Sequence, residues 1–556
     1  MDESAERTKV EFREWGAEPF AVAERAGKPV LLSLSARWCV GCHEMDRETY
    51  DEPRIAANCS DGFVPVRVDA DRQPRVRERY AMGGFPSTVF LTPDGEVLTG
   101  AGYLGQDGMR QVLDRVRRSW DEKGAAAGTV PRALAGDPTP SGDLSADIVE
   151  RLTGRLRDLS DERAGGWGES QKFPLPGAIE FALKHDRETA LRSLSAVSAN
   201  LLDDVDGGFF RVAENRDWSG LHHEKITDVN AALVRAFANA YLYTGREEFR
   251  TPAAETVEYL TTTLWVADPP GGGRGAFAGS QAGDETGYYR LGATERADAD
   301  PPAVDETVFA DRTALAVDAL LTYHAYTDDD RARQFAERAL DYLRTSLVED
   351  GETVHFRAAG ADGETAPTGL LADQAAVLGA LTTAAQVLGA DTVAEAEAVA
   401  DWTIDHLHDE GSFRDGPADG PALLSRPLRP LDDNVAMADA LLDLAAMTGD
   451  DRYRGVARES AAAFAGAADR FGPQIASYGS VVSRLLEPQL TVAVAAPAGS
   501  DLHRAALRVA DHDVVVLPDA DGERFESGHA YVVRGEEVAP PAATPQELSE
   551  RVAELL

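Results

Sequence analysis

The chain has 556 residues, 43% of them hydrophobic, so it is too long for a single small core and too apolar for a disordered protein. Asp and Glu outnumber Lys and Arg by 95 to 55, which gives a formal net charge of −40, and only six residues are lysine. A charge of this sign and size argues against nucleic acid and anionic membrane as partners, because both are themselves negatively charged.

The acidic, lysine-poor composition is typical of cytoplasmic proteins from halophiles that accumulate salt, since concentrated salt screens the repulsion between surface charges. Residues 1–6 are charged and lack the apolar segment of a signal peptide. No apolar run looks long enough to span a bilayer. Three cysteines are too few for a disulfide scaffold in a chain of this length. We therefore expect a cytoplasmic protein.

An α/β unit is expected at residues 1–121. Short apolar runs of strand length alternate with a helical pattern, and glycine and proline mark the turns. A C-x-x-C motif directly after a strand, followed by a later Gly-Gly-Phe-Pro turn, predicts a thioredoxin-like fold. The expected elements are, in order, a strand at 29–34, the Cys39-Val40-Gly41-Cys42 motif with a helix after it, a strand at 63–69, the Gly83-Gly84-Phe85-Pro86 turn, a strand at 88–91 and a helix over 108–120.

Cys39 and Cys42 are interpreted as a redox dithiol. A cysteine at a helix N-terminus feels the positive end of the helix dipole, which stabilises its thiolate and makes Cys39 the nucleophile. Cys42 lies one turn further along and can resolve a mixed disulfide. Pro86 stands where a thioredoxin fold has a cis-proline beside the cysteines, and only X–Pro bonds adopt the cis form at low cost. We therefore predict catalytic roles for Cys39, Cys42 and Pro86.

Two other chemistries use the same residues. A zinc site would draw on Cys39, Cys42, His43 or Cys59, but Cys42 and His43 are adjacent on a helix and point in different directions. The sequence C-x-x-C-H also matches the attachment motif of c-type haem, which normally requires export. Cys59 alone is most often a buried apolar residue. The dithiol is favoured over both alternatives, so we expect no metal and no cofactor.

A helical repeat is expected at residues 143–488, after an Ala-, Gly- and Pro-rich linker at 122–142. Four long apolar helices begin with the pattern Asp-x-x-Ala, about 60 residues apart where no insertion, such as that at 271–302, intervenes. Roughly twelve helices in six hairpins favour a closed (α/α)6 toroid over an open solenoid, which would need capping repeats. Residues 489–556 predict a small α/β unit. The four helices begin at Asp228, Asp311, Asp373 and Asp433.

Several blocks of sequence carry a family resemblance. They are residues 28–45, 63–69 and 91–95, Gln171-Lys172-Phe173-Pro174, Asp206-Gly207-Gly208-Phe209, His222-His223-Glu224-Lys225 and Ala530-Tyr531-Val532. These blocks resemble the spermatogenesis-associated thioredoxin-domain family, and the acidic composition indicates a haloarchaeal-type member. The resemblance implies a thioredoxin-like domain joined to a six-hairpin glycosidase-like domain. That second domain is similar in fold to sugar epimerases of the N-acylglucosamine 2-epimerase type.

The chain departs from this family at the motif and at the tail. Val40-Gly41 replaces the usual His-Trp between the cysteines, and Val533 and Val538 stand where the tail usually carries a Cys pair. Thioredoxins commonly hold a buried acid six residues before the first cysteine, and this chain has Ser33 there. The proton handling and the reduction potential of the dithiol are therefore not implied by the resemblance.

A second site is expected at the toroid mouth, where the inner helices start. Sugar isomerases of this fold move a proton beside a carbonyl with paired histidines or carboxylates, and His222 or His223 with Glu224 would supply this. Tryptophans would stack on a sugar. The structural alternative is that an Asp at a helix start is an N-cap or a first-turn residue facing the helix dipole. The candidates are Trp167, Lys172, His222, His223, Glu224, Lys225 and Asp228.

Three functions fit these features. The first is thiol–disulfide exchange by the thioredoxin-like domain, coupled to a toroid that binds a carbohydrate-like ligand, and it implies a thiol redox partner protein. The second is a carbohydrate-active enzyme of the sugar 2-epimerase kind, in which the thioredoxin-like domain is regulatory or structural. The third is a binding module in which both sites are inert. We favour the first, and a toroid mouth that faces Cys39 and Cys42 would indicate coupling.

Overall fold

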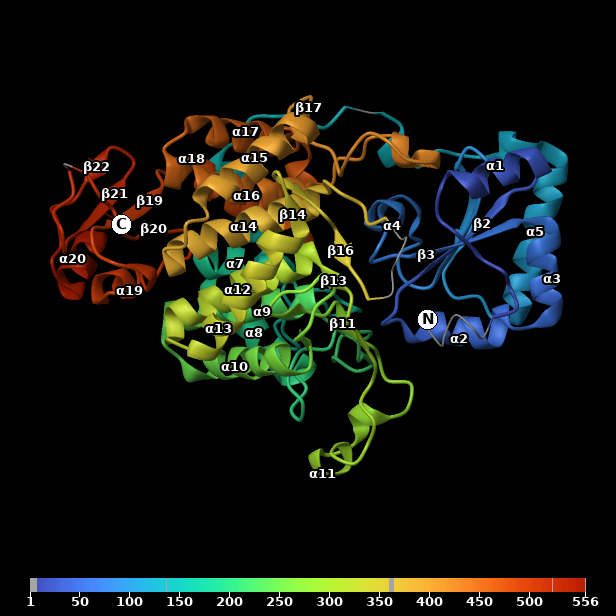
Figure 1. The fold of residues 1–556 in the computed structure, drawn as a ribbon, viewed down its shortest axis with the longest axis horizontal. Coiled ribbons are helices and arrows are strands. Elements are labelled where there is room, and N and C mark those ends of the chain that lie inside the picture. The colour runs from blue at the N-terminus through green and yellow to red at the C-terminus, as the bar shows by residue number, and fades with distance from the viewer. Residues whose placement is uncertain (1–7, 137, 360–364, 523, 556) are drawn as a thin grey trace.

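A computed structural model describes residues 8–136, 138–359, 365–522 and 524–555, so the charged segment 1–6 lies outside the described residues. Three units follow one another along the chain. In Figure 1 the N-terminal unit is blue at the right, the helical unit fills the middle and the C-terminal unit is red at the left.

The N-terminal unit is a mixed sheet with the strand order β1-β3-β2-β4-β5. Strand β2 is parallel to β3 and antiparallel to β4. Alternate residues of β2 face opposite sides, so Leu32 packs in the cluster of α1 and α4, and Leu31 in that of α3 and α5. The elements are β1 (Arg13–Glu14), α1 (Ala17–Ala26), β2 (Val30–Ser35), α2 (Val40–Met45), α3 (Pro53–Gly62), β3 (Val64–Asp69), α4 (Pro74–Tyr80), β4 (Ser87–Leu91), β5 (Val97–Ala101) and α5 (Gln106–Lys123).

Part of the segment predicted as a linker, 122–142, packs on the N-terminal unit, and its end bonds to the helical unit through Pro140 and Gly142. Thr129 pairs with Val97 of β5, and Leu134 is buried in the cluster under β2. Leu423 and Leu424, which belong to a loop of the helical unit, are buried in the same cluster. The two units therefore share part of a hydrophobic core.

The helical unit is a closed ring of inner helices surrounded by outer helices, which confirms the predicted (α/α)6 toroid. Among the described residues, each inner helix packs against the next, and α18 packs against α7 to close the ring. The inner helices are α7 (Pro176–His185), α9 (Thr227–Thr244), α12 (Ala310–Thr327), α14 (Leu371–Leu388), α16 (Leu431–Thr448) and α18 (Ser477–Leu486). The outer helices are α6 (Ala146–Leu159), α8 (Arg187–Leu201), α10 (Glu247–Thr262), α13 (Asp330–Tyr342), α15 (Val393–Leu407) and α17 (Asp451–Ala462).

Short strand pairs form the loops of the toroid. They are β6 (Val212–Ala213) with β7 (Leu221–His222), β9 (Trp265–Val266) with β10 (Ala276–Phe277), β13 (Val308–Phe309) with β16 (Phe356–Arg357), β14 (Val348–Glu349) with β15 (Glu352–Thr353), and β17 (His408–Asp409) with β18 (Ser412–Phe413). A three-stranded sheet joins β8 (Lys225–Ile226), β11 (Ser280–Gln281) and β12 (Val304–Asp305). We call residues 282–303, between β11 and β12, the arm; it carries α11 (Ala293–Arg296).

Inner helices are apolar because neighbouring helices cover most of their surface. Helix α14 is long and apolar enough to cross a membrane by length and composition, so the expectation of no such run was wrong. It packs between α12 and α16 and under α15, and two-thirds of it is buried. Its place in the toroid accounts for its composition.

The four Asp-x-x-Ala patterns mark the starts of α9, α12, α14 and α16. In each case the aspartate lies in the first turn of the helix and not at its N-cap. The N-cap residues make no side-chain capping bond; they are Ile226, Phe309, Leu370 and Pro430. The sequence left two structural roles open for these aspartates, N-cap or first-turn residue, and the structure shows the first-turn role.

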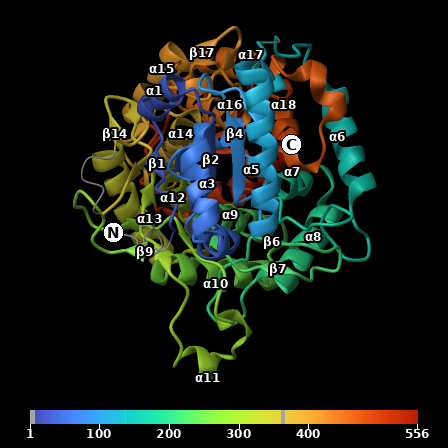
Figure 2. The same cartoon turned by 90° about the vertical axis from the view of Figure 1, so that its right-hand side faces the viewer.

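The C-terminal unit lies at the opposite end of the toroid from the N-terminal unit (Figure 1). Figure 2 views the molecule from the N-terminal side, with the blue unit in front of the ring of helices. Lys184 of α7 pairs with Asp511 and Asp513, which ties the C-terminal unit to the ring. Its elements are β19 (Leu490–Val494), α19 (Asp501–Leu507), β20 (Val515–Leu517), β21 (Ala530–Arg534), β22 (Glu537–Val538) and α20 (Pro545–Leu555).

Candidate functional site

Cys39 and Cys42 lie at the start of α2 and are joined by a disulfide. Cys39 is the N-cap of α2, and its Sγ accepts a hydrogen bond from the backbone N–H of Cys42 at 3.1 Å. The Phe85–Pro86 peptide bond is cis, which confirms the sequence prediction. A Cβ at Gly41 would lie only 3.3 Å from Cδ of Pro86. The glycine therefore lets the proline ring lie directly against the motif.

The toroid covers this disulfide. Cys39 is 5% exposed and Cys42 is 3% exposed. Both pack in one apolar cluster with Ile226 and Val229 at the start of α9, and Phe85 lies against the same cluster. The mouth of the toroid thus faces the disulfide.

Polar contacts hold the motif to the toroid. Trp38 donates its indole N–H to Oδ2 of Asp71 at 2.8 Å, and its carbonyl accepts from the N–H of Gly283 in the arm at 3.2 Å. Oδ1 of Asp71 pairs with the guanidinium of Arg312 in α12 at 2.9 Å. The carbonyl of Asp71 accepts from Nε2 of His355 at 2.7 Å. Asp71 therefore links Trp38 to two elements of the toroid.

Asp311, His355 and Asp373 form a group of described residues close enough to hold a metal ion, with ligand atoms within 4.8 Å of one another. Nδ1 of His355 lies 2.9 Å from the Asp373 carboxylate, and Nε2 faces a carbonyl, so both nitrogens carry protons. Although burial opposes a charged ring, the Asp373 carboxylate raises the pKa of His355 to about 9. A doubly protonated ring has no lone pair for a metal, so the group is satisfied as an ion pair.

A carboxylate that the sequence reasoning missed lies next to the motif. The backbone N–H of Asp46 bonds to the carbonyl of Cys42, so Asp46 stands one helical turn after that cysteine. Burial raises the pKa of Asp46, although its partner Arg67 opposes the shift. Arg67 lies opposite Ser33 in the β2–β3 pairing. The Asp46–Arg67 ion pair thus lies beside Ser33, the position where thioredoxins hold a buried acid. The Cys-x-x-x-Asp spacing of Cys42 and Asp46 is the sequence pattern from which this carboxylate could have been predicted.

A cleft of 530 Å³ opens beside the motif, between the N-terminal unit and the arm. Nδ1 of His43 and the guanidinium of Arg47 both contact the carboxylate of Glu285, at 2.6 and 2.7 Å. Ser280 in its wall is 1% exposed, and its hydroxyl has no hydrogen-bond partner among the described residues. The charged residues that line the cleft are Arg37, His43, Asp46, Arg47, Glu285, Asp300 and Asp305.

Lys172 and Lys225, two candidates for the second site, hold turns of the toroid together. Each side chain is fully buried, and each Nζ donates to an Asp carboxylate and to a glycine carbonyl of an Asp-x-x-x-Gly turn. The distances are 2.7 and 2.7 Å for Lys225, and 3.0 and 3.0 Å for Lys172. The partners are Asp203 and Gly207 for Lys225, and Asp161 and Gly165 for Lys172. The Nζ atoms of both lysines are therefore used in contacts that hold the toroid loops together.

His222 and Glu224 lie near the Cys39–Cys42 motif. Nε of Arg211 donates to Oε1 of Glu224 at 2.6 Å, and its guanidinium lies 5.2 Å from the centre of the Trp38 ring. Nε2 of His222 lies 2.9 Å from Oε1 of Glu214. The hydrogen bond with Glu224 raises the pKa of His222, while burial opposes the shift.

The remaining candidates are packed separately. His223 stacks on Tyr289 with 5.3 Å between ring centroids, and burial lowers its pKa. Trp167 is buried and donates its indole N–H to a backbone carbonyl. Asp228 accepts from the next backbone N–H in α9, and burial raises its pKa. The structure does not bring the seven candidates together, and their role as a second site stays a prediction.

Residues 3–134 match the family model Thioredox_DsbH, a protein of unknown function, DUF255. The N-terminal unit is a thioredoxin-like domain. The chain is 28% identical over 292 residues to spermatogenesis-associated protein 20 of Homo sapiens, covering 46% of this chain and 37% of that protein. It is 30% identical over 103 residues to thiol:disulfide interchange protein DsbD 1 of Pseudomonas aeruginosa, covering 18% and 17%. The matches thus span less than half of these relatives.

Two solved structures are similar to the toroid. A sugar epimerase from a ruminal bacterium has 13% identity and a TM-score of 0.45, covering 56% of this chain and 84% of that chain. The cellobiose 2-epimerase of Spirochaeta thermophila has 18% identity and a TM-score of 0.44, covering 56% and 82%. Both TM-scores lie below 0.5. The toroid is assigned from the contacts between successive inner helices, which close the ring.

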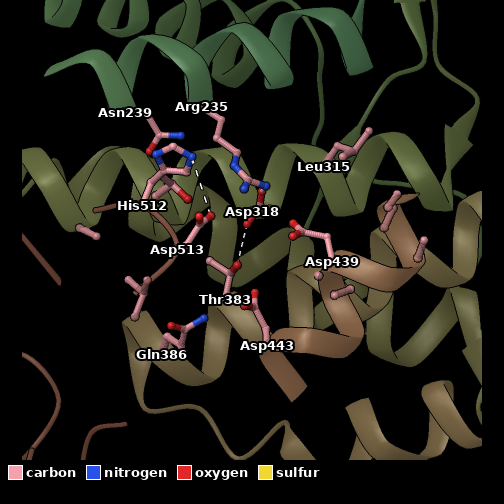
Figure 3. Close-up of a pocket in the computed structure, with 18 of the residues that line it drawn as sticks. Arg235, Asn239, Leu315, Asp318, Thr383, Gln386, Asp439, Asp443, His512 and Asp513 are labelled. Carbon is pink, nitrogen blue, oxygen red and sulfur yellow. Dashed lines mark hydrogen bonds and ion pairs between the residues drawn. The ribbon is translucent and has the colours of Figure 1, made fainter. Parts of the chain in front are cut away.

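A chamber of 410 Å³ lies inside the ring, with Arg77 of the thioredoxin-like domain at one end and residues 511–514 with Val516 at the other. Figure 3 shows Arg235 beside Asp318, with their ion pair at 2.9 Å. Oδ1 of Asn239 has no partner among the described residues. The sequence reasoning placed candidate residues at the toroid mouth and missed this interior. Polar residues within the apolar inner helices are the sequence feature from which this chamber could have been predicted.

Asp433 lines the end of the chamber that faces the thioredoxin-like domain. Burial, together with the charges of Glu78, Asp432 and Asp415, raises its pKa to about 7, and Arg77 opposes this shift. Because this pKa lies above the ordinary value of 3.8, the folded state holds the proton more tightly than the unfolded state. The contribution of this group to stability is therefore present at about pH 4 and is lost as the pH rises to about 7.

We expect Asp433→Asn to reduce the fall in stability between about pH 4 and pH 7, because asparagine does not titrate. Thermal unfolding midpoints of wild type and variant at both ends of this range, at one salt concentration, measure the effect. Asp107→Asn is the matched control, since the side chain of Asp107 is 90% exposed. A decline with pH as steep in Asp433→Asn as in wild type would contradict the assignment.

Proposed function

We propose that this protein is a thiol–disulfide oxidoreductase, with Cys39 as the nucleophile and Cys42 as the resolving cysteine. The observation that carries the proposal is the N-cap position of Cys39, whose sulfur accepts the backbone N–H of Cys42 at 3.1 Å. In the reduced protein the same N–H group and the helix dipole stabilise a thiolate at this position. Pro86, packed against Gly41, positions the motif.

The reaction proceeds in two exchanges. The Cys39 thiolate attacks one sulfur of a substrate disulfide, forms a mixed disulfide and releases one substrate thiolate. Cys42 then attacks the sulfur of Cys39, which releases the second substrate thiolate and restores the Cys39–Cys42 disulfide. Two electrons pass to the substrate, and an external dithiol reductant regenerates the protein. Cys59 takes no part, because it is fully buried and burial raises its pKa to about 12.

The setting of this activity is part of the proposal. All three cysteines lie in the thioredoxin-like domain, so the reducing equivalents come from a separate thiol redox partner protein. Relatives named thiol:disulfide interchange protein support the activity. We also propose a halophilic, cytoplasmic protein of the haloarchaeal type, without nucleic-acid or membrane partners, on the grounds of its net charge of −40.

Variants of the two cysteines test the proposal. We expect Cys42→Ser to accumulate a mixed disulfide on Cys39, because the resolving thiol is missing, and Cys39→Ser to accumulate none and to lose turnover. Mass spectrometry after incubation with a disulfide substrate measures both. Cys59→Ala is the control and keeps turnover. Wild-type turnover in Cys39→Ser would disprove the proposal.

We propose a second function, the binding of a small carbohydrate-like ligand in the chamber. The supporting observation is the unpartnered Oδ1 of Asn239 in a polar chamber of 410 Å³, the size of a small-molecule site. His222 and His223 do not line this chamber, so an epimerase reaction would need other bases. Thermal shift with a panel of sugars tests binding. Stabilisation that Asn239→Leu abolishes would support it, and a panel without any shift would count against it.

A further inference from the structure

The covered disulfide limits the size of the substrate. Contact between two proteins typically buries about 800 Å² on each side. The face of the thioredoxin-like domain that carries Cys39 is instead occupied by Ile226 and Val229. The arm adds a backbone hydrogen bond from Gly283 to Trp38, and Arg211 lies over the Trp38 ring. A disulfide in a folded protein arrives with backbone on both sides, and this face has no room for it.

The cleft offers a narrower approach beside the motif; Cys39 itself is not among the residues that line it. Its volume of 530 Å³ lies within the range of about 300–1,000 Å³ found for small-molecule sites. Trp38 and His43 stand on either side of Cys39 in the sequence, and both line the cleft. The N–H of His43 bonds to the carbonyl of Cys39, so the two residues are one helical turn apart on one face.

The walls of the cleft indicate the charge of its ligand. Arg37 and Arg47 place guanidinium groups in the cleft, and Asp300 and Asp305 place carboxylates there. Arg47 pairs with Glu285 at 2.7 Å and Arg37 lies 3.6 Å from Asp305, so the carboxylate and ammonium groups of a ligand would exchange with these pairs. The hydroxyl of Ser280, 1% exposed and without a partner among the described residues, is an unused hydrogen-bonding group in the same wall. A buried polar group of this kind is normally paired, so a bound ligand would satisfy it.

We infer that the substrate is a low-molecular-weight disulfide of the amino-acid type, carrying both ammonium and carboxylate groups. This inference rests on the proposed thiol–disulfide exchange. The reduced protein transfers two electrons to the small disulfide in the two exchanges already described, and two small thiols leave through the cleft. An external dithiol restores the protein. The toroid thus acts as a size filter on the thioredoxin-like domain.

Three disulfides of different size and charge test the inference, with dithiothreitol as the reductant. Oxidised glutathione is small and zwitterionic, bis(2-hydroxyethyl) disulfide is small and neutral, and insulin is a protein. We expect kcat/KM for oxidised glutathione to exceed that of the neutral disulfide by about tenfold or more, the value of one charge-assisted contact. Insulin should be reduced more slowly than both, because the covered face excludes it.

Variants of the cleft arginines locate the recognition. Arg37→Gln with Arg47→Gln should reduce kcat/KM for oxidised glutathione about tenfold more than for the neutral disulfide, mainly through KM. Arg110→Gln makes the same change on the exposed face of α5 and should leave the ratio unchanged. Insulin reduced as fast as oxidised glutathione, or a ratio unaffected by the double variant, would overturn the inference. Reduction of none of the three would instead disprove the proposed function.

Discussion

Replacing Asp415 with asparagine should lower the free energy of unfolding by about 3–5 kcal/mol, because it leaves buried arginines without their counter-charge. Asp415 is 6% exposed and accepts from Arg79 at 2.6 and 3.2 Å and from Arg75 at 3.0 Å. The side chain of Arg79 is fully buried. Both arginines belong to α4 of the thioredoxin-like domain, whereas Asp415 follows β18 of the toroid. Asparagine has the same shape, so the loss is electrostatic and creates no cavity.

Urea unfolding at constant salt measures this loss. Asp107→Asn is the matched control, because Asp107 pairs with Arg110 at 3.0 Å with its side chain 90% exposed, and exposed pairs contribute about 1 kcal/mol or less. Limited proteolysis between the two units provides a second measurement, since a detached thioredoxin-like domain would expose the segment at 122–142. If Asp415→Asn unfolds within about 1 kcal/mol of wild type, this ion pair does not hold the domains together.

Lowering the salt concentration should destabilise the whole protein. A net charge of −40 repels itself, and the Debye length grows from about 3 Å at 1 M to about 10 Å at 0.1 M ionic strength. We expect the thermal midpoint at 0.1 M KCl to lie about 10 °C or more below that at 1 M, which at about 2.1 cal/mol/K per residue corresponds to roughly 12 kcal/mol for the whole chain. Thermal unfolding at a series of KCl concentrations measures it.

A charge variant separates screening from other effects of salt. Four acids with side chains at least 82% exposed can be neutralised together, which changes the net charge from −40 to −36. We expect this variant to lose less stability at low salt than wild type. Equal salt dependence in the two proteins would attribute the effect to salt exclusion from the surface instead. The four substitutions are Asp107→Asn, Glu188→Gln, Glu410→Gln and Asp501→Asn.

The thioredoxin-like elements and the ring of hairpins could be predicted because their signals are local. Strand length, the C-x-x-C spacing and the residues around Pro86 lie within short windows, and the Asp-x-x-Ala starts recur along the chain. Local patterns were less reliable for predicting which segments are buried, because burial depends on packing against distant parts of the chain. The apolar run of α14 resembles a membrane span by composition, and Thr129 and Leu134 of the Ala-, Gly- and Pro-rich segment pack on the N-terminal unit.

The Cys39–Cys42 motif combines features set by local sequence with features set by packing. Its residue types and its place at a helix start follow from Cys39-Val40-Gly41-Cys42 and the strand before it. The cover over it comes from far along the chain, because Ile226 and Val229 of the toroid pack on the two cysteines. Beside the motif, His43 contacts Glu285 over a separation of 242 residues. The motif and its place at a helix start were thus determined by local sequence. What reaches it was decided only by the tertiary structure, because no local pattern specifies which distant surfaces bury one another.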